Sequence, residues 1–95
     1  MNESTMLEML KVDLGISTTA YDQRLAQYLD SALAAIITEG VSVDTSDVQD
    51  ANLVVMYAAW LWRKRDTGEG MPRNIRWILN NRLFSEKIKW MMLSD

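Results

Sequence analysis

Apolar residues recur at helical spacing in two successive segments of the first half of the chain. Residues 5–14 begin with Thr5, which has the spacing of a capping box, and end before Gly15. Residues 19–39 carry a longer apolar stripe that ends before Gly40. Each segment is therefore predicted to be an amphipathic helix.

The second half of the chain repeats this pattern twice. Residues 46–66 follow Ser46, a good helix cap for which Asp44 is an alternative. Residues 72–84 start with Pro72, which is favoured in the first turn of a helix. Since only the tail has any strand-like alternation, the pattern predicts an all-α fold: a small bundle of about four helices in a single domain, residues 1–95.

The tail, residues 85–95, fits two patterns. Ile88 and Trp90 alternate with lysines as they would in a strand, whereas Phe84, Ile88 and Met91 fit helical spacing. Both alternatives stay open at this point. We expect a C-terminal arm whose apolar side chains need a partner surface.

The segment 46–66 is apolar nearly all round, which a monomer of this size cannot bury on every side. We therefore expect part of this helix to contact the other helices and part to contact a neighbouring subunit. The residues predicted to form the core are Leu10, Leu25, Leu29, Ile36, Val55, Ala59, Trp62, Ile75 and Leu79.

Charge is divided unevenly along the chain. The net charge is −3, but residues 1–50 hold two basic and nine acidic residues, whereas residues 51–95 hold eight basic and four acidic ones. Opposed patches of this kind suit the docking of identical subunits. Seven Met and four Trp are many for 95 residues, and both types are enriched where protein surfaces meet.

The basic corner that follows Trp62 allows three interpretations. Arg63, Lys64 and Arg65 could cap a helix and pack around the tryptophans, could touch nucleic-acid phosphates, or could contact the acidic half of another copy. We favour the third, because the charge division and the apolar arm both favour a partner. The predicted subunit or partner interface is Trp60, Arg63, Lys64, Arg65, Arg73, Arg76, Ile88, Trp90, Met91 and Met92.

Composition argues against several classes of function. There is no Cys and no His, so the usual nucleophile, the usual neutral-pH base and the commonest transition-metal ligands are missing. The carboxylates of Asp44, Asp47 and Asp50 surround a predicted helix start, where negative charge is expected for structural reasons. We expect no enzymatic activity, no metal site and no cofactor. The longest apolar run is shorter than the roughly 20 residues that a membrane span needs, and no secretory signal is visible, so a soluble chain is expected.

Two stretches together resemble a known family. The run "YDQRLAQYLDSAL" from Tyr21 and the run "DVQDANLVVMYAAWLWRKRDTGEGMPRNIRWILNNRL" from Asp47 are similar to the small head-tail connector, or adaptor, proteins of long-tailed bacteriophages and prophages. The resemblance covers roughly residues 5–85. Its most specific part is the order of Tyr57, two tryptophans, two arginines, a glycine-containing turn and Met71-Pro72 before the last helix.

This resemblance implies a structural, non-enzymatic role in virion assembly. Family members form a closed ring, typically of about twelve copies, which requires a heterologous interface. The ring lies at the head-tail junction of the virion after assembly in the host cytoplasm. Its partners are the portal protein, a tail-side head-completion protein and double-stranded DNA that passes without sequence specificity; no membrane is involved. The alternative is a small helical DNA-binding or DNA-packaging regulator in which Arg63, Arg65, Arg73 and Arg76 touch phosphates.

Overall fold

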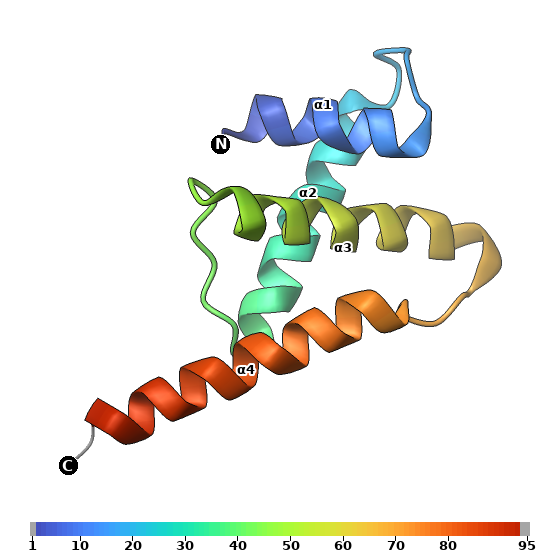
Figure 1. Ribbon diagram of the computed structural model, residues 1–95. Coiled ribbons are helices and arrows are strands. Elements are labelled where there is room, and N and C mark those ends of the chain that lie inside the picture. Colours follow the sequence, from blue (N-terminus) through green and yellow to red (C-terminus); the bar gives the residue numbers. More distant parts are fainter. Residues whose placement is uncertain (1, 94–95) are drawn as a thin grey trace.

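The computed structural model describes residues 2–93 and contains four helices (Figure 1). In chain order these helices are α1 (Glu3–Leu14), α2 (Asp22–Thr38), α3 (Val48–Thr67) and α4 (Arg73–Leu93). Within the described range there is no strand. The predicted all-α fold of about four helices is confirmed.

Helix α3 lies at the centre of the molecule and packs against the other three helices, most extensively against α2. Its buried side chains cover most of its circumference and include Leu53, Val54, Val55 and Ala58, whereas Asn52 on the remaining side is exposed. Most of the apolar surface of this helix is therefore covered by its own chain, and the expected contact of part of it with a neighbouring subunit stays a prediction. A helix that is apolar nearly all round is enclosed here by its own chain, because α1, α2 and α4 approach it from different directions.

All nine residues predicted to form the core are buried, and Leu10, Leu25, Ile36 and Leu79 are completely inaccessible to solvent. Lys11 joins this interior although it is charged. Its ammonium group lies 2.9 Å from a carboxylate oxygen of Asp22, an ion pair that links the end of α1 to the start of α2.

Side-chain caps set the starts of α1 and α3, and both caps differ from the prediction. Asn2 caps α1 by accepting from the backbone N–H of Thr5, so that helix begins earlier than expected. Asp47, rather than Ser46 or Asp44, caps α3 by accepting from the N–H groups of Gln49 and Asp50. All of these residue types are good caps, so the three-dimensional path of the chain selects among them.

The glycine stop at Gly15 is as expected, and Gly68 ends α3 in the same way, since both residues occupy the left-handed region that glycine adopts without a steric penalty. The remaining predicted starts are close. The second helix begins at Asp22 rather than at residue 19, and Pro72 lies immediately before α4.

The predicted end of the last helix at residue 84 is wrong, and so is the strand alternative for the tail. Helix α4 continues to Leu93 without a break. After Pro72 the chain contains no further proline or glycine, so nothing in the backbone stops the helix. Residues 85–93 of the arm are therefore about two and a half further turns of α4; its last two residues, 94 and 95, lie outside the described residues.

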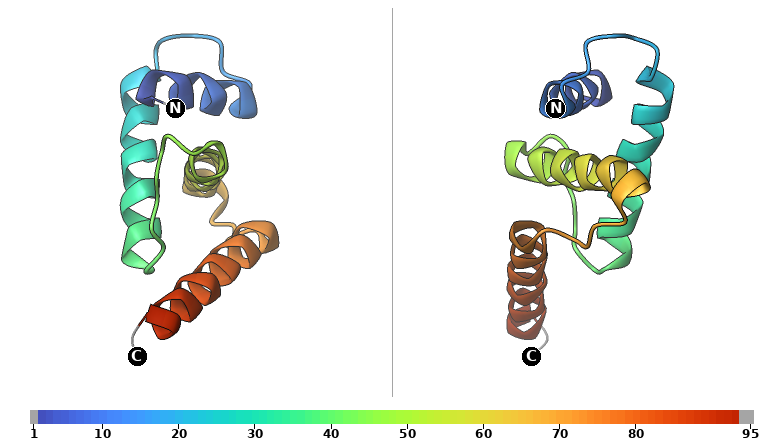
Figure 2. Two further views of the ribbon diagram at one scale, coloured as in Figure 1. Left: turned by 60° about the vertical axis from the view of Figure 1, so that its left-hand side comes forward. Right: turned by 90° about the vertical axis from the view of Figure 1, so that its right-hand side faces the viewer.

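The whole molecule measures 53 × 28 × 17 Å along its principal axes, and the second half of α4 projects beyond the body formed by the other helices (Figures 1 and 2). Only Ile75 and Leu79, both in the first half of α4, are buried. In every view α1 lies at one end of the molecule and α4 at the other. The two helices are separated by α3.

Candidate interaction surface

An ion pair holds α4 against the start of α3. The guanidinium of Arg82 donates to a carboxylate oxygen of Asp50 and, through its other terminal nitrogen, to the backbone carbonyl of Ser42 at 2.9 Å. The second carboxylate oxygen of Asp50 accepts from the N–H of Asp44. The hydrogen bond from Arg82 lowers the pKa of Asp50 below its usual range, and the same bond raises the pKa of Arg82.

Further contacts join the linker before α3 to α4. The carboxylate of Glu86 accepts from the N–H of Ser42 at 2.8 Å. Gly40 has a φ of 102°, and a Cβ placed there would lie 3.2 Å from the side chain of Leu83. A larger residue at position 40 would therefore crowd α4. Together with Arg82, these contacts fix where α4 crosses the body.

Arg76 was expected at a subunit interface, but it has a partner within the chain. Its guanidinium forms a two-point pair with the carboxylate of Glu39, at 2.8 and 3.2 Å. This pairing raises the pKa of Arg76. The pair ties the end of α2 to the first turns of α4, so most of the charge of Arg76 is already neutralised.

The basic corner packs on the tryptophans of α3. The guanidinium of Arg65 lies 3.6 Å from the ring centre of Trp62 and donates to the backbone carbonyl of the same residue. The ammonium of Lys64 lies 4.6 Å from the ring centre of Trp60. These are cation–π contacts. Lys64 and Arg65 therefore pack around the tryptophans of their own chain, as the first of the three interpretations of this corner expects.

The predicted interface position of Trp60 is wrong for this chain. Its side chain is 7 % exposed, its indole N–H donates to the carbonyl of Glu69, and its ring meets Tyr57 edge-on. The loop after α3 folds back to provide that carbonyl, which the spacing of residues along the helix does not reveal. Arg63 lies near Glu69 at 3.8 Å and stays about half exposed.

The C-terminal half of α4 contains four of the predicted interface residues, and all four are exposed: Ile88, Trp90, Met91 and Met92. Trp77, Phe84 and Leu93 are also exposed, and sequence reasoning did not assign them to the interface. At 3.6 residues per turn, one apolar stripe runs along the side of α4 that faces away from Ile75 and Leu79. We call this side the α4 outer face; it consists of Arg73, Trp77, Asn80, Phe84, Lys87, Ile88 and Met91.

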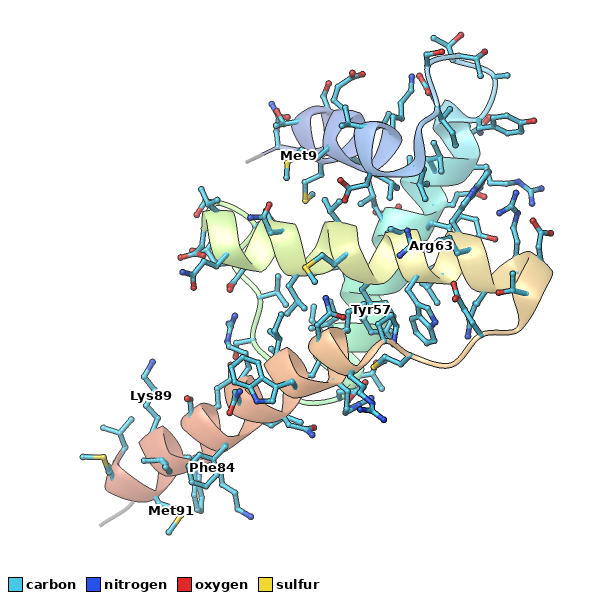
Figure 3. All side chains as sticks on the ribbon, turned by 45° about the vertical axis from the view of Figure 1, so that its right-hand side comes forward. Met9, Tyr57, Arg63, Phe84, Lys89 and Met91 are labelled. Atoms are coloured by element: carbon cyan, nitrogen blue, oxygen red, sulfur yellow. The ribbon has the colours of Figure 1, made fainter. Side chains whose placement is uncertain are left out.

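Figure 3 shows Phe84 and Met91 projecting from the same side of α4, away from the body, whereas Lys89 projects from the opposite side. Trp77 is 69 %, Phe84 65 % and Met91 61 % exposed. Single exposed apolar residues are ordinary on a protein surface, but a row of large ones on one helix face marks a contact site.

At the other end of the molecule, α1 presents a shallow apolar groove to solvent. It is lined by Thr5, Glu8, Met9, Val12 and Asp13, and Val12 is 78 % exposed. We call this the α1 outer face. Its two carboxylates form none of the ion pairs seen among residues 2–93.

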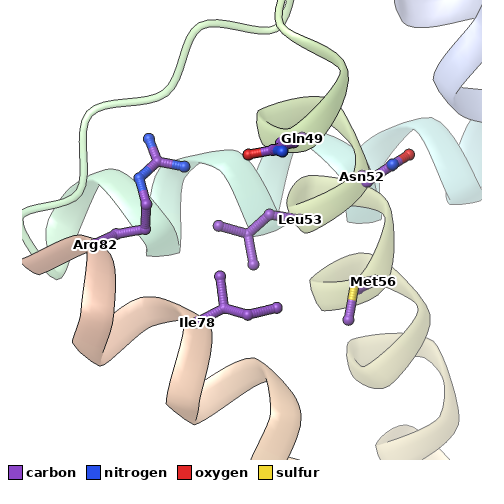
Figure 4. A pocket seen from close by; sticks show the side chains of 6 residues that line it. All are labelled: Gln49, Asn52, Leu53, Met56, Ile78 and Arg82. Carbon is purple, nitrogen blue, oxygen red and sulfur yellow. The ribbon is translucent and has the colours of Figure 1, made fainter.

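A second groove, of about 270 Å³, lies between α3 and α4 (Figure 4). Leu53, Met56 and Ile78 form its apolar floor, while Gln49, Asn52 and Arg82 supply polar groups at its edge. Because Arg82 is engaged by Asp50, this groove offers little free charge to a ligand.

Over residues 2–93 no group of acidic residues is arranged to hold a metal ion, and no described helix is long and apolar enough to cross a membrane. No protein-family model matches the chain, and no significant similarity links it to a curated protein or to a solved structure. The site therefore has to be interpreted from its own geometry: two exposed faces, one basic and aromatic, the other acidic and aliphatic.

Proposed function

We propose that this chain is a structural subunit of a phage head-tail connector, which assembles with copies of itself into a ring below the portal. The observation that carries the proposal is the α4 outer face, whose large apolar side chains project into solvent beyond the folded body. An exposed row of Trp, Phe, Ile and Met is typical of a surface that another protein covers.

The resemblance of residues 5–85 to small connector proteins supplies the kind of assembly. In that setting the ring extends the DNA channel and provides a docking platform for the next head-completion or tail protein. The four-helix body and the predominance of acidic residues suit a channel through which DNA passes without being held, because phosphate affinity rises with each cation engaged.

The alternative of a DNA-binding regulator finds less support in the contacts of its four arginines. Arg76 is paired with Glu39, and Arg65 is stacked on Trp62. Arg63 lies near Glu69. Of the four arginines, Arg73 is exposed and forms no ion pair among residues 2–93, and a single phosphate contact gives little affinity.

The test is the mass of the purified chain across a dilution series, combined with negative-stain microscopy. The proposal predicts concentration-dependent rings and only weak retention of a DNA duplex in a gel-shift assay. A chain that stays monomeric at every concentration contradicts the proposal. If that monomer or a dimer binds duplex DNA tightly, the alternative function takes its place.

A further inference from the structure

The two outer faces have complementary chemistry. The α4 outer face carries the cations Arg73 and Lys87 and no carboxylate, whereas the α1 outer face carries the carboxylates of Glu8 and Asp13 and no cation. Within residues 2–93 neither of these two cations forms an ion pair. Each face thus lacks the charge that the other supplies.

The apolar parts of the two faces also have matching shapes, a groove on α1 and a ridge on α4. The groove of α1 is open and shallow and is lined by the aliphatic side chains of Met9 and Val12. The α4 outer face offers a straight ridge that contains Phe84 and Ile88. A ridge of side chains on one helix packs into a groove on another in ordinary helix–helix contacts, with the helix axes about 8–10 Å apart.

The projecting part of the α4 outer face cannot reach the α1 outer face of its own molecule. Helix α1 and the projecting part of α4 lie at opposite ends of the body, with α3 between them (Figure 2). The whole molecule is 53 Å long, and α4 is fixed to the body by the pair of Arg82 with Asp50. A partner for either face must come from another molecule.

We infer that the α4 outer face of one copy docks on the α1 outer face of the next copy, head to tail. This inference rests on the proposed function, since it names the surfaces through which a ring would be built. Two different faces of the same chain that fit each other form a heterologous contact, which closes into a ring when the rotation between copies permits. Charge complementarity favours this pairing of faces over contacts between like-charged faces, and the apolar ridge supplies the buried area.

The experiment is a charge swap followed by complementation. One variant, Arg73→Glu with Lys87→Glu, makes the α4 outer face acidic; the other, Glu8→Lys with Asp13→Lys, makes the α1 outer face basic. Each variant on its own brings like charges together, so the midpoint concentration of assembly should rise by about tenfold or more. An equimolar mixture restores both contacts and should assemble at the midpoint of the unmodified chain.

The matched control is Arg24→Glu with Lys89→Glu, which changes the net charge by the same amount away from the α4 outer face. It should assemble as the unmodified chain does, and circular dichroism should show that every variant keeps its helices. If the unmodified chain assembles but both swap variants do so equally well, or if their mixture stays dissociated, the inference is overturned and the proposed function stands. An unmodified chain that never assembles overturns both.

Discussion

Asp50 is the residue through which α4 is tied to the start of α3. Its side chain is nearly buried, and Arg82 and the N–H of Asp44 satisfy both of its oxygens. Asp50→Asn should lower the free energy of unfolding by about 1–3 kcal/mol, because Arg82 loses its charged partner but can still reach water. Urea unfolding at neutral pH measures this.

Glu39→Gln is the matched comparison, since it breaks the more exposed pair with Arg76. Surface pairs contribute about 0.2–1 kcal/mol, so the loss should be smaller than for Asp50→Asn. Equal losses for the two variants would show that the enclosure of Asp50 is unimportant.

The same carboxylate predicts a pH dependence. Because the hydrogen bond from Arg82 lowers the pKa of Asp50 in the folded protein, the stabilisation is fully present above the unfolded pKa of about 3.9. It is lost as the pH falls through the folded pKa. The difference in unfolding free energy between the unmodified chain and Asp50→Asn should therefore be constant from pH 7 to about 5 and shrink below about pH 4. A difference that grows in acid would contradict this assignment.

Arg65 and Arg63 should respond differently to charge reversal, although they are close neighbours in the sequence. Arg65→Glu removes the stacking on Trp62 and the hydrogen bond to its carbonyl, which should lower the free energy of unfolding by about 1–2 kcal/mol. Arg63→Glu changes an exposed group, and its effect should stay within about 0.5 kcal/mol. Thermal unfolding of the two variants provides the comparison; similar losses would mean that the stacking contributes nothing.

At the scale of the helix, the hydrogen bond between Glu86 and Ser42 connects the last turns of α4 to the body, and no side chain in those turns is buried. A chain that ends after Phe84 should therefore lose about 1 kcal/mol or less of stability, and its assembly should be abolished. Circular dichroism and light scattering measure the two effects. Leu79→Ala, with the arm intact, is the opposite control, since a core cavity costs about 2–5 kcal/mol. If the truncated chain no longer unfolds cooperatively, the arm belongs to the core.

The order and type of the helices could be predicted because their apolar residues recur with one period. That signal failed where two periods fit equally well, as at Ile88 and Trp90. The caps were uncertain for a related reason: Asn2, Thr5, Asp44 and Asp47 all have suitable side chains, and only the path of the backbone decides which one accepts the N–H groups.

The candidate site was less accessible from the sequence than the fold. Asp50 and Arg82 are 32 positions apart, so no local pattern connects them. Trp60 is covered by a loop that returns to it, which periodicity cannot indicate. By contrast, the exposure of Ile88 and Met91 follows from an apolar stripe that continues after the body has ended, and the helical spacing from Phe84 to Met91 contained that signal.

At the scale of the whole molecule, the opposite charges of the two ends predict that assembly depends on salt. Raising the ionic strength from about 0.1 to 1 M shortens the screening length from about 10 to 3 Å, so the midpoint concentration of assembly should increase. Light scattering across a salt series measures the shift. The Glu8→Lys with Asp13→Lys variant should show the reverse trend, because salt relieves its repulsion. An assembly that tightens with salt in the unmodified chain would show that apolar contact alone drives it.

The angle at which α4 leaves the body has a consequence for any assembly built through it. Helix α4 is held in one orientation by Arg82, by Glu86 and by the close approach of Leu83 to Gly40. The arm is therefore a rigid lever and not a flexible linker. The inclination of that lever determines how far each successive subunit is turned, and hence the curvature of the array. Loosening the anchor at Asp50 should therefore broaden the distribution of ring diameters before it prevents neighbours from joining.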